Sequence, residues 1–202
     1  MNNSSTFYIV RHSETDWNVK HLMQGHSDSE LTSKGIKDSG KLARKFKSIN
    51  FDLIFSSDLS RARRTAEAIS LERDIALKTT ELIRERRYGE FEGKPNTEYE
   101  AVNEALDKLS EEQKYTYKHS PGIESDEEVV NRFLTFIREV AVANPEKTIL
   151  AVSHGGIMRA FLKKLGLKNT IRGGIRNNAY IKLETDGVEF DIKETSGITF
   201  SD

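Results

Sequence analysis

The run Thr148-Ile149-Leu150-Ala151-Val152 constrains the fold of this chain more than any other segment. Because consecutive side chains of a strand point to opposite faces, an almost wholly apolar run predicts a strand that is covered on both faces. Such strands occur at the centre of parallel sheets with helices packed on either side. The segment therefore predicts an α/β protein, specifically a three-layer α/β/α sandwich around a mostly parallel central sheet.

Strand and helix patterns alternate along the rest of the chain, as this fold class requires. Short β-favouring runs predict strands at 7–10, 52–56 and, at a sheet edge, 75–77. The Thr185-Asp186-Gly187 turn predicts a hairpin between strands at 180–184 and 188–192. Helices are expected at four places: from Thr32 or Ser33 with Ile36, Gly40, Ala43 and Phe46 at helical spacing, over 59–71, after the Ser125–Glu128 capping box, and over 156–165.

The segment from about 90 to 122 departs from this alternation. It is charged and helix-permissive, with Tyr99, Val102, Leu106 and Leu109 at helical spacing, and Pro121-Gly122 ends it. We expect residues 1–202 to form a single domain in which this segment is a lid inserted over the ligand-binding edge of the sheet.

Composition limits the kinds of partner. The chain has 202 residues and a formal net charge of -1, so it has no overall attraction for nucleic acid or an anionic membrane. No apolar run approaches the roughly 18 to 20 residues of a membrane span, and the N-terminal residues lack a signal-peptide pattern. The absence of cysteine excludes disulfides and thiolate metal sites. We expect a cytoplasmic protein, with its oligomeric state left open.

Polar groups follow three of the predicted strands at the point where each ends. The first strand runs into Arg11-His12, the second into the Ser56–Arg61 segment, and the central one into Ser153-His154-Gly155-Gly156. Because the carboxyl ends of parallel strands share one edge of a sheet, these groups are expected to meet there. The third segment also opens a helix, whose unpaired N–H groups would face the same point. Two arginines, two histidines and a helix N-terminus favour a tetrahedral oxyanion.

Other interpretations of these residues are weaker. Taken singly, Arg11-His12 could be a strand end in solvent and Ser153–Gly156 a tight turn. A metal site on His12 and His154 lacks an acidic ligand at a suitable spacing, and the arginines would repel a cation. A serine hydrolase would need a Gly-x-Ser-x-Gly elbow, which the chain lacks. Phosphate is the ligand that fits best, and no metal or cofactor is expected.

Several blocks together resemble the histidine phosphatase superfamily, in its phosphoglycerate-mutase-like branch. They appear in the family's order over nearly the whole chain: Arg11-His12-Ser13-Glu14-Thr15 with Asn18, Gln24-Gly25, Leu31-Thr32-Ser33-Lys34-Gly35, Ser56-Ser57-Asp58-Leu59-Ser60-Arg61-Ala62 with Thr65-Ala66, Leu82-Ile83-Arg84-Glu85 with Gly89 and Glu92-Gly93, Gly122-Ile123-Glu124-Ser125, and Ser153-His154-Gly155-Gly156. The first block alone is weakly specific, whereas the set is strongly specific. The resemblance implies a phosphoglycerate-mutase-like fold.

The resemblance also implies a role for the residues that bind the phosphoryl group. His12 is the expected nucleophile, neutral at the attacking ring nitrogen, with the proton of its other nitrogen held by a backbone carbonyl. Arg11 and Arg61 are expected to clamp the phosphoryl oxygens, and His154 to complete the cage around the transition state. Glu85 matches the proton donor that protonates the leaving alkoxide and then activates water. The remaining expected phosphate or substrate contacts are Asn18, Gln24, Gly25 and Gly155.

Four further positions are predicted to have structural rather than catalytic roles. Ser13 replaces the glycine typical of the first block, and it would be strained if that position needed a positive φ. Glu14 and Glu92 are expected to be structural supports rather than reactive groups. His26, like the other histidines outside the cage, is expected at the surface, near the rim of the pocket.

These roles predict a phosphomonoester hydrolase that acts through a phosphohistidine on His12, on a small phosphorylated metabolite. The short segment between Glu85 and His154 favours the open phosphatase type over the mutases of the family. A cofactor-dependent phosphoglycerate mutase is the alternative, and a non-catalytic phospholigand-binding module is a third possibility. Sugar phosphates, phosphorylated carboxylic acids and nucleotide-loop phosphates all remain candidate substrates.

Overall fold

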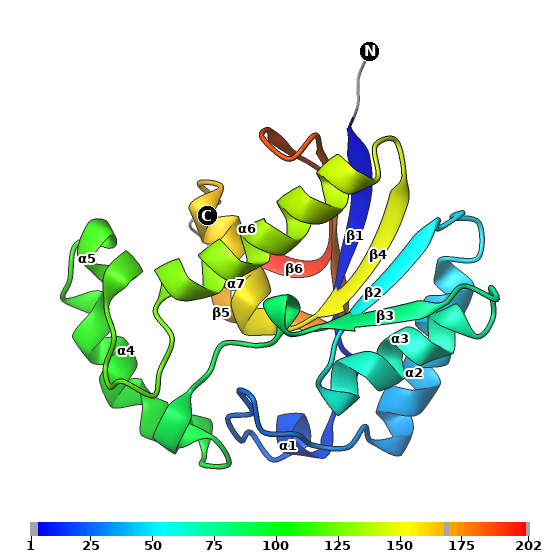
Figure 1. Ribbon diagram of the computed structural model, residues 1–202. Helices are drawn as coiled ribbons and strands as arrows, with labels where there is room; N and C mark the ends of the chain where they lie inside the picture. The colour runs from blue at the N-terminus through cyan, green and yellow to red at the C-terminus, as the bar shows by residue number, and fades with distance from the viewer. Residues whose placement is uncertain (1–3, 168–169, 201–202) are drawn as a thin grey trace.

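A six-stranded sheet forms the centre of the computed structural model, which describes residues 4–167 and 170–200 (Figure 1). The strand order is β3-β2-β4-β1-β5-β6. The strands are β1 Ser5–Arg11, β2 Leu53–Ser57, β3 Leu77–Thr80, β4 Thr148–Ser153, β5 Thr170–Thr185 and β6 Phe190–Phe200. The first four are parallel to one another, while β5 and β6 add an antiparallel hairpin at one side. This confirms the α/β fold and the mostly parallel sheet.

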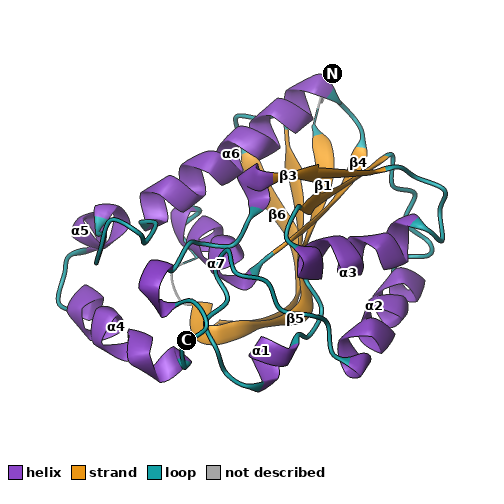
Figure 2. Ribbon diagram, turned by 60° about the horizontal axis from the view of Figure 1, so that its bottom comes forward, coloured by secondary structure: helices purple, strands orange, loops and turns teal. Residues whose placement is uncertain are grey.

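Helices cover both faces of the sheet, as the apolar central run predicted. The sheet separates α2 (Ser33–Lys45) and α3 (Ser60–Ser70) from α6 (Asp126–Ala143) and α7 (Gly155–Lys164), as Figure 2 shows. Leu150 and Val152 of β4 lie in the core that includes α2 and α3, whereas Ile149 and Ala151 lie in the core that includes α6 and α7. Alternate residues of one strand therefore belong to two separate hydrophobic cores.

Most predicted element boundaries hold to within a few residues. Ser125 caps α6 through a capping box, and Thr32 caps α2 by accepting a hydrogen bond from the amide of Gly35. The expected inner face of α2 is only partly right, because Ala43 and Phe46 are buried whereas Ile36 is not. Ile36 is 62% exposed, and the buried side of the helix carries Gly35, Ser39, Leu42 and Ala43. Ser39 is buried because its hydroxyl is satisfied by hydrogen bonds, which hydrophobic periodicity does not register.

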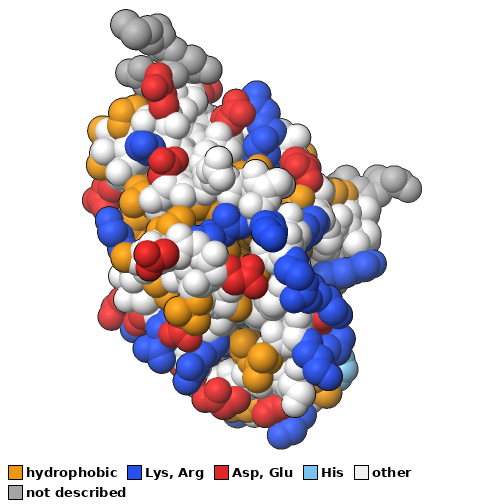
Figure 3. Space-filling view, turned by 90° about the vertical axis from the view of Figure 1, so that its right-hand side faces the viewer, with side chains coloured by type: hydrophobic (Ala, Val, Ile, Leu, Met, Phe, Trp, Pro, Cys, Tyr) orange, Lys and Arg blue, Asp and Glu red, His pale blue; other side chains and the backbone are white. Residues whose placement is uncertain are grey.

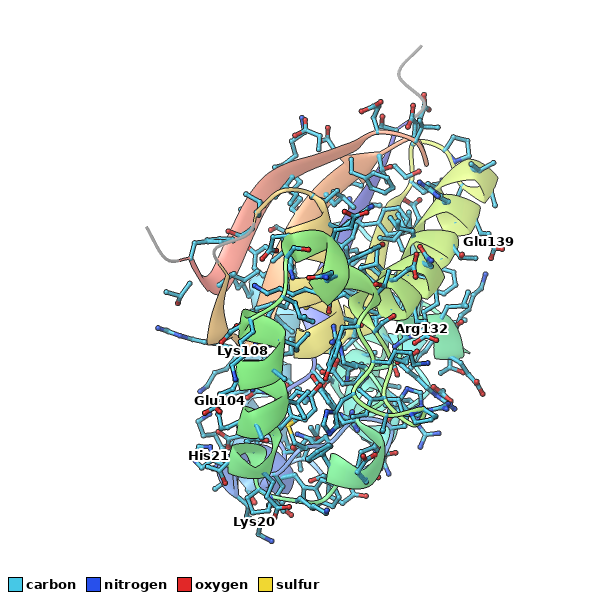
Figure 4. The ribbon with its side chains drawn as sticks, turned by 90° about the vertical axis from the view of Figure 1, so that its left-hand side faces the viewer. Lys20, His21, Glu104, Lys108, Arg132 and Glu139 are labelled. Atoms are coloured by element: carbon cyan, nitrogen blue, oxygen red, sulfur yellow. The ribbon has the colours of Figure 1, made fainter. Side chains whose placement is uncertain are left out.

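The segment after β3 consists of short helices beside the carboxyl edge of the sheet. These are η1 Glu81–Ile83, η2 Gly89–Phe91, η3 Asn96–Tyr99, α4 Glu100–Asp107 and α5 Glu111–Thr116. Tyr99, Val102 and Ile123 form a small hydrophobic cluster of their own there. Glu104 of α4 and Lys108, which directly follows this helix, are exposed (Figure 4). The helical character expected for this segment is confirmed.

The surface mixes charges of both signs. Acidic and basic side chains both occur across the face seen in Figure 3, which carries α2 and α3. None of the helices in residues 4–167 and 170–200 has the length and hydrophobicity needed to cross a membrane.

Candidate active site

Two histidines meet where β1 and β4 end. The strands are parallel neighbours with Arg11 opposite Ser153, and the amide of His12 donates to the carbonyl oxygen of Ser153 at 2.9 Å. His154 follows β4 as the N-cap residue of α7. The ring centroids of His12 and His154 are 5.1 Å apart. The predicted convergence at the carboxyl edge of the sheet is therefore present in the structure.

The His12 ring is held in one tautomer by its own neighbour. Its Nδ1 lies 2.7 Å from the carbonyl oxygen of Ser13, which can only accept, so Nδ1 carries the proton and Nε2 has the free lone pair. Burial, together with the positive charges of Arg61 and Arg11, holds the pKa of His12 well below its usual value. His12 is therefore a neutral imidazole whose Nε2 is the available nucleophilic atom.

Both predicted arginines are in place, and each is anchored by part of its guanidinium group. Arg61, which is 1% exposed, donates from Nη2 to the carbonyl oxygen of Gly25 at 2.7 Å and from Nη1 to that of Ser27 at 2.8 Å. Arg11 donates from Nη1 to the carbonyl oxygen of Ile175, and burial lowers its pKa to about 10. These anchors fix the planes of both groups and leave each Nε buried with no protein partner among the described residues.

Unpartnered polar atoms identify what this site can bind. Besides the Nε atoms of Arg11 and Arg61, both ring nitrogens of the fully buried His154 and Oε1 of Gln24 have no hydrogen-bond partner in the described part of the chain. Buried polar groups are rarely left unpaired, because each costs roughly 1–3 kcal/mol. Several N–H donors close to the neutral Nε2 of His12 fit an oxyanion that also contacts a nucleophile.

The carboxylate of Glu85 lies at the N-terminus of α7, which the sequence predicts to face the bound anion. It accepts hydrogen bonds from the amides of Gly156 at 2.9 Å and Ile157 at 3.0 Å, and from the amide of Arg86 at 2.8 Å. The expectation that these first N–H groups of α7 face the phosphate is thus wrong, because a carboxylate of the protein already satisfies them. An added Cβ at Gly156 would lie 2.5 Å from Oε1 of Glu85, so a larger residue there would displace this carboxylate.

The remaining predicted contacts lie on the loops opposite α7. Asn18, in α1 (Asp16–Val19), has its Oδ1 held by the Thr15 amide and by Nδ2 of Asn177. Gly25 has a φ of +56° and presents its carbonyl oxygen to Arg61. Asn18 and Gly25 line one cavity of about 780 Å³ together with Arg11, His12, Gln24, Arg61, Glu85 and Gly155. His154 lies beside His12 but is not part of this lining. Residues of η3, α4 and α5 line its other side.

Comparison with known proteins agrees with this geometry. The profile of the histidine phosphatase superfamily (branch 1) matches residues 7–196. The chain belongs to the histidine phosphatase superfamily, branch 1.

Two relatives of known sequence and one solved structure show the range of this family. The chain is 34% identical to the broad-specificity phosphatase YOR283W of Saccharomyces cerevisiae, over 83% of its own length and 73% of the relative. It is also 34% identical to the 2,3-bisphosphoglycerate-dependent phosphoglycerate mutase of Beijerinckia indica, over 78% and 79%. The crystal structure of phosphoglycerate mutase from Bacillus anthracis str. Sterne superimposes with a TM-score of 0.80 at 25% identity, covering 97% of this chain and 94% of that one.

Ser13, where this histidine phosphatase departs from the typical first block, is accommodated without strain. It is not among the non-glycine residues with positive φ, so the backbone does not require glycine there. Its hydroxyl lies 2.7 Å from that of Ser39 and donates to Oδ1 of Asn178 at 2.6 Å. Serine in place of glycine therefore adds a buried hydroxyl group whose hydrogen bonds are satisfied.

The two expected acidic supports hold loops in place. Glu14 accepts hydrogen bonds from the hydroxyl of Thr32 and from Lys34. Glu92 accepts from the amides of Ser27 and Tyr88, among others, and so fixes the loop that carries Gly25. Within the described ranges, no three His, Asp or Glu side chains are grouped as metal ligands would be.

Sequence reasoning missed the group that positions the Glu85 backbone. Arg132 of α6 donates to the carbonyl oxygens of Leu82, Arg84 and Glu85, and it pairs with Glu124 (Arg132 is labelled in Figure 4).

The second missed contact comes from His26, which was expected at the surface. His26 is partly buried, and its Nε2 lies 2.9 Å from the same Glu85 carbonyl oxygen. The sequence does contain an indication for Arg132. An arginine side chain beside the apolar stripe of α6 needs polar partners inside the fold. His26 offered no comparable sign.

Proposed function

We propose that this protein is a phosphomonoester hydrolase that transfers the phosphoryl group of a small metabolite to Nε2 of His12 and then to water. The observation that carries the proposal is the set of buried, unpartnered donors around that neutral nitrogen. Arg11, Arg61 and His154 supply N–H groups that need no reorganisation to stabilise negative charge as it develops. Asn18, Gln24, Gly25 and Gly155 complete the proposed binding set at the cavity wall.

In the first step, Nε2 of His12 attacks phosphorus and the bond from phosphorus to the ester oxygen breaks. The leaving oxygen takes a proton from the carboxyl group of Glu85, which lines the same cavity. In the second step, water attacks the phosphohistidine and gives a proton to the Glu85 carboxylate. The nitrogen–phosphorus bond breaks, inorganic phosphate leaves, and His12 returns to its neutral form. Neither step uses a metal or cofactor.

Two expectations extend this proposal. We infer that residues 90–122 act as a lid, which is supported by the residues that η3, α4 and α5 contribute to the cavity lining. We also place this site in a single domain, since the profile match runs from residue 7 to residue 196. The cytoplasmic location expected from the cysteine-free sequence stays a prediction.

A phosphate-release assay over a panel of phosphorylated metabolites tests the function, with His12→Ala as the control. The proposal expects release by the wild type, retained in chelator, and none by the variant. If the protein neither hydrolyses an activated aryl phosphate nor becomes phosphorylated at His12, the proposal that it is an enzyme is rejected.

The relatives include mutases as well as phosphatases, so the same preparation is tested for phosphoryl exchange between phosphoglycerate isomers. A mutase shows exchange that depends on a catalytic amount of bisphosphate primer. The proposed hydrolase instead shows net release of phosphate without primer.

A further inference from the structure

Strand β5 is irregular where it passes the phosphate cage. Its pairing register with β6 shifts between Ile175 and Tyr180, and Asn178 within that stretch has a φ of +61°. Successive side chains of a regular strand point to opposite faces. Here the side chains of two successive residues, Asn177 and Asn178, both reach the segment that follows β1. The irregularity therefore supplies this segment with polar contacts that a regular strand could not make.

The carboxamide of Asn177 bridges two residues of the proposed site. Its Nδ2 donates to the carbonyl oxygen of His12 at 3.0 Å and to Oδ1 of Asn18 at 3.1 Å. Because a backbone carbonyl can only accept a hydrogen bond, the Nδ2 end of Asn177 must face both partners. Asn177 itself is not among the residues that line the cavity, so it contacts the site from behind.

The orientation of the Asn18 carboxamide follows from the same argument. Its Oδ1 accepts from the amide of Thr15 at 3.1 Å, from the hydroxyl of Thr15 at 3.1 Å, and from Asn177. Because a backbone amide can only donate, the oxygen end of this carboxamide must face Thr15. Nδ2 is then the end that is left for the cavity, which Asn18 lines. A phosphoryl oxygen needs such an N–H donor and would be repelled by an acceptor.

We propose that Asn177 is a positioning residue that holds Asn18 with its donor end toward the phosphoryl group. Thr15 lies next to Asn18 in the chain and holds it only within its own short helix, α1. Asn177 adds a contact from β5 and is itself anchored on the carbonyl oxygen of His12. This inference rests on the proposed function, because it takes Asn18 as a phosphate contact. It adds to that function a residue that acts without touching the substrate.

Asn177→Asp tests the proposal by replacing the donor with an acceptor of the same shape. A carboxylate oxygen would repel Oδ1 of Asn18, and reversal of the Asn18 carboxamide would turn an acceptor toward the phosphoryl group. The Kd of inorganic phosphate, measured by calorimetry, should rise about tenfold to hundredfold, and kcat/KM for 4-nitrophenyl phosphate should fall by a similar factor. Asn177→Ala removes the donor without adding a charge, so it should weaken binding in the same direction and replaces the first variant if that one does not fold.

Asn178→Asp is the matched control, because it places the same negative charge on the neighbouring residue. Its carboxylate can still accept from the hydroxyl of Ser13, and the bond to Oδ1 of Asn18 comes from Asn177 alone of these two asparagines. Phosphate affinity should stay within roughly threefold of the wild-type value, since a partly exposed charge is screened by water. Equal losses in Asn177→Asp and Asn178→Asp would show that the charge alone weakens binding, and the proposal would be overturned.

A double-mutant cycle with Asn18→Ala separates positioning from a purely structural role. If Asn177 acts through Asn18, the loss of phosphate affinity caused by Asn177→Asp should shrink to roughly threefold or less once Asn18 is replaced. An undiminished loss in that background would contradict the proposal.

This binding assay needs no turnover, so it distinguishes the positioning role from the proposed function. If the wild type binds phosphate but hydrolyses no phosphate ester, the proposed function fails, while a diminished loss in the cycle still supports the role of Asn177. If the wild type binds no phosphate, the positioning role fails as well.

Discussion

Nδ1 of His12 lies 2.7 Å from the carbonyl oxygen of Ser13. This contact determines which nitrogen can accept a phosphoryl group, because Nδ1 is occupied by its proton. We predict that the trapped phosphoenzyme carries the group on Nε2. Phosphorus and proton NMR of the denatured, alkali-stabilised phosphoenzyme distinguishes the two isomers. Phosphate on Nδ1 would contradict the assigned tautomer.

The buried histidines make stability dependent on pH. Burial holds the pKa of both His12 and His154 well below the usual value, so both are neutral in the folded protein. Unfolding exposes them to water, where they bind protons below pH of about 6.5. Because the unfolded state then binds more protons, the free energy of unfolding falls as the pH falls from about 6.5 toward 5. Each histidine contributes up to about 1.4 kcal/mol per pH unit.

Urea denaturation at several pH values measures this slope. His26, whose pKa is also lowered by burial, acts in the same direction. His154→Asn should therefore reduce the dependence of the free energy of unfolding on pH by the contribution of one histidine. The contribution of the other buried histidines should remain. A slope identical to that of the wild type would show that His154 is protonated in the folded protein.

Glu85→Gln separates proton donation from the structural contacts of this side chain. The amide oxygen of glutamine can still accept from the amide of Gly156 or Ile157, so the fold should be retained. It cannot supply a proton, so turnover of an alkyl phosphate should fall about 10²- to 10⁴-fold. Turnover of 4-nitrophenyl phosphate, whose leaving group needs little protonation, should fall far less. Equal losses in the two assays would remove Glu85 from the leaving-group step.

Gly25→Ala should disrupt the loop that anchors Arg61. The residue has a φ of +56°, and an added Cβ would lie 2.1 Å from Oε1 of Glu92. Left-handed backbone costs alanine roughly 1–2 kcal/mol, and overpacking adds about 1–3 kcal/mol. Gly166→Ala is the matched control, since φ is +86° there but nothing lies within 4 Å of the added atom. Thermal unfolding and aryl phosphatase activity should both be affected more at Gly25 than at Gly166.

Arg132→Gln should reduce kcat without a comparable change in KM. The substitution removes donors to the carbonyl oxygens of Arg84 and Glu85 and so releases the backbone that places the proton donor. A displacement of about 1 Å can cost on the order of a hundredfold in rate. Arg73→Gln is the control, because Arg73 also donates to backbone carbonyls, those of Phe46 and Ile49, but lies outside the cavity lining. If both variants lose only stability, Arg132 has no positioning role.

The sequence was sufficient to predict the sheet and the cage because each depends on local chemistry. An apolar run covered on both faces predicted β4, and polar strand ends predicted the meeting of His12 with His154. Contacts between distant segments were not predictable in the same way. The placement of Glu85 on the amides of α7 joins residues about seventy positions apart, and no periodicity encodes it. The inner face of α2 was predicted only in part, since Ala43 lies on it but the buried Ser39 looks polar in sequence.

The contact between Glu85 and the start of α7 provides a direct spectroscopic reporter of the catalytic proton. When the carboxyl group gains or loses that proton, its strength as an acceptor for the amides of Gly156 and Ile157 must change. The chemical shifts of the backbone amide groups of Gly156 and Ile157 therefore report the protonation state of Glu85 during titration or ligand binding. Isotope labelling of the peptide backbone alone is enough to follow it, with no label on the substrate.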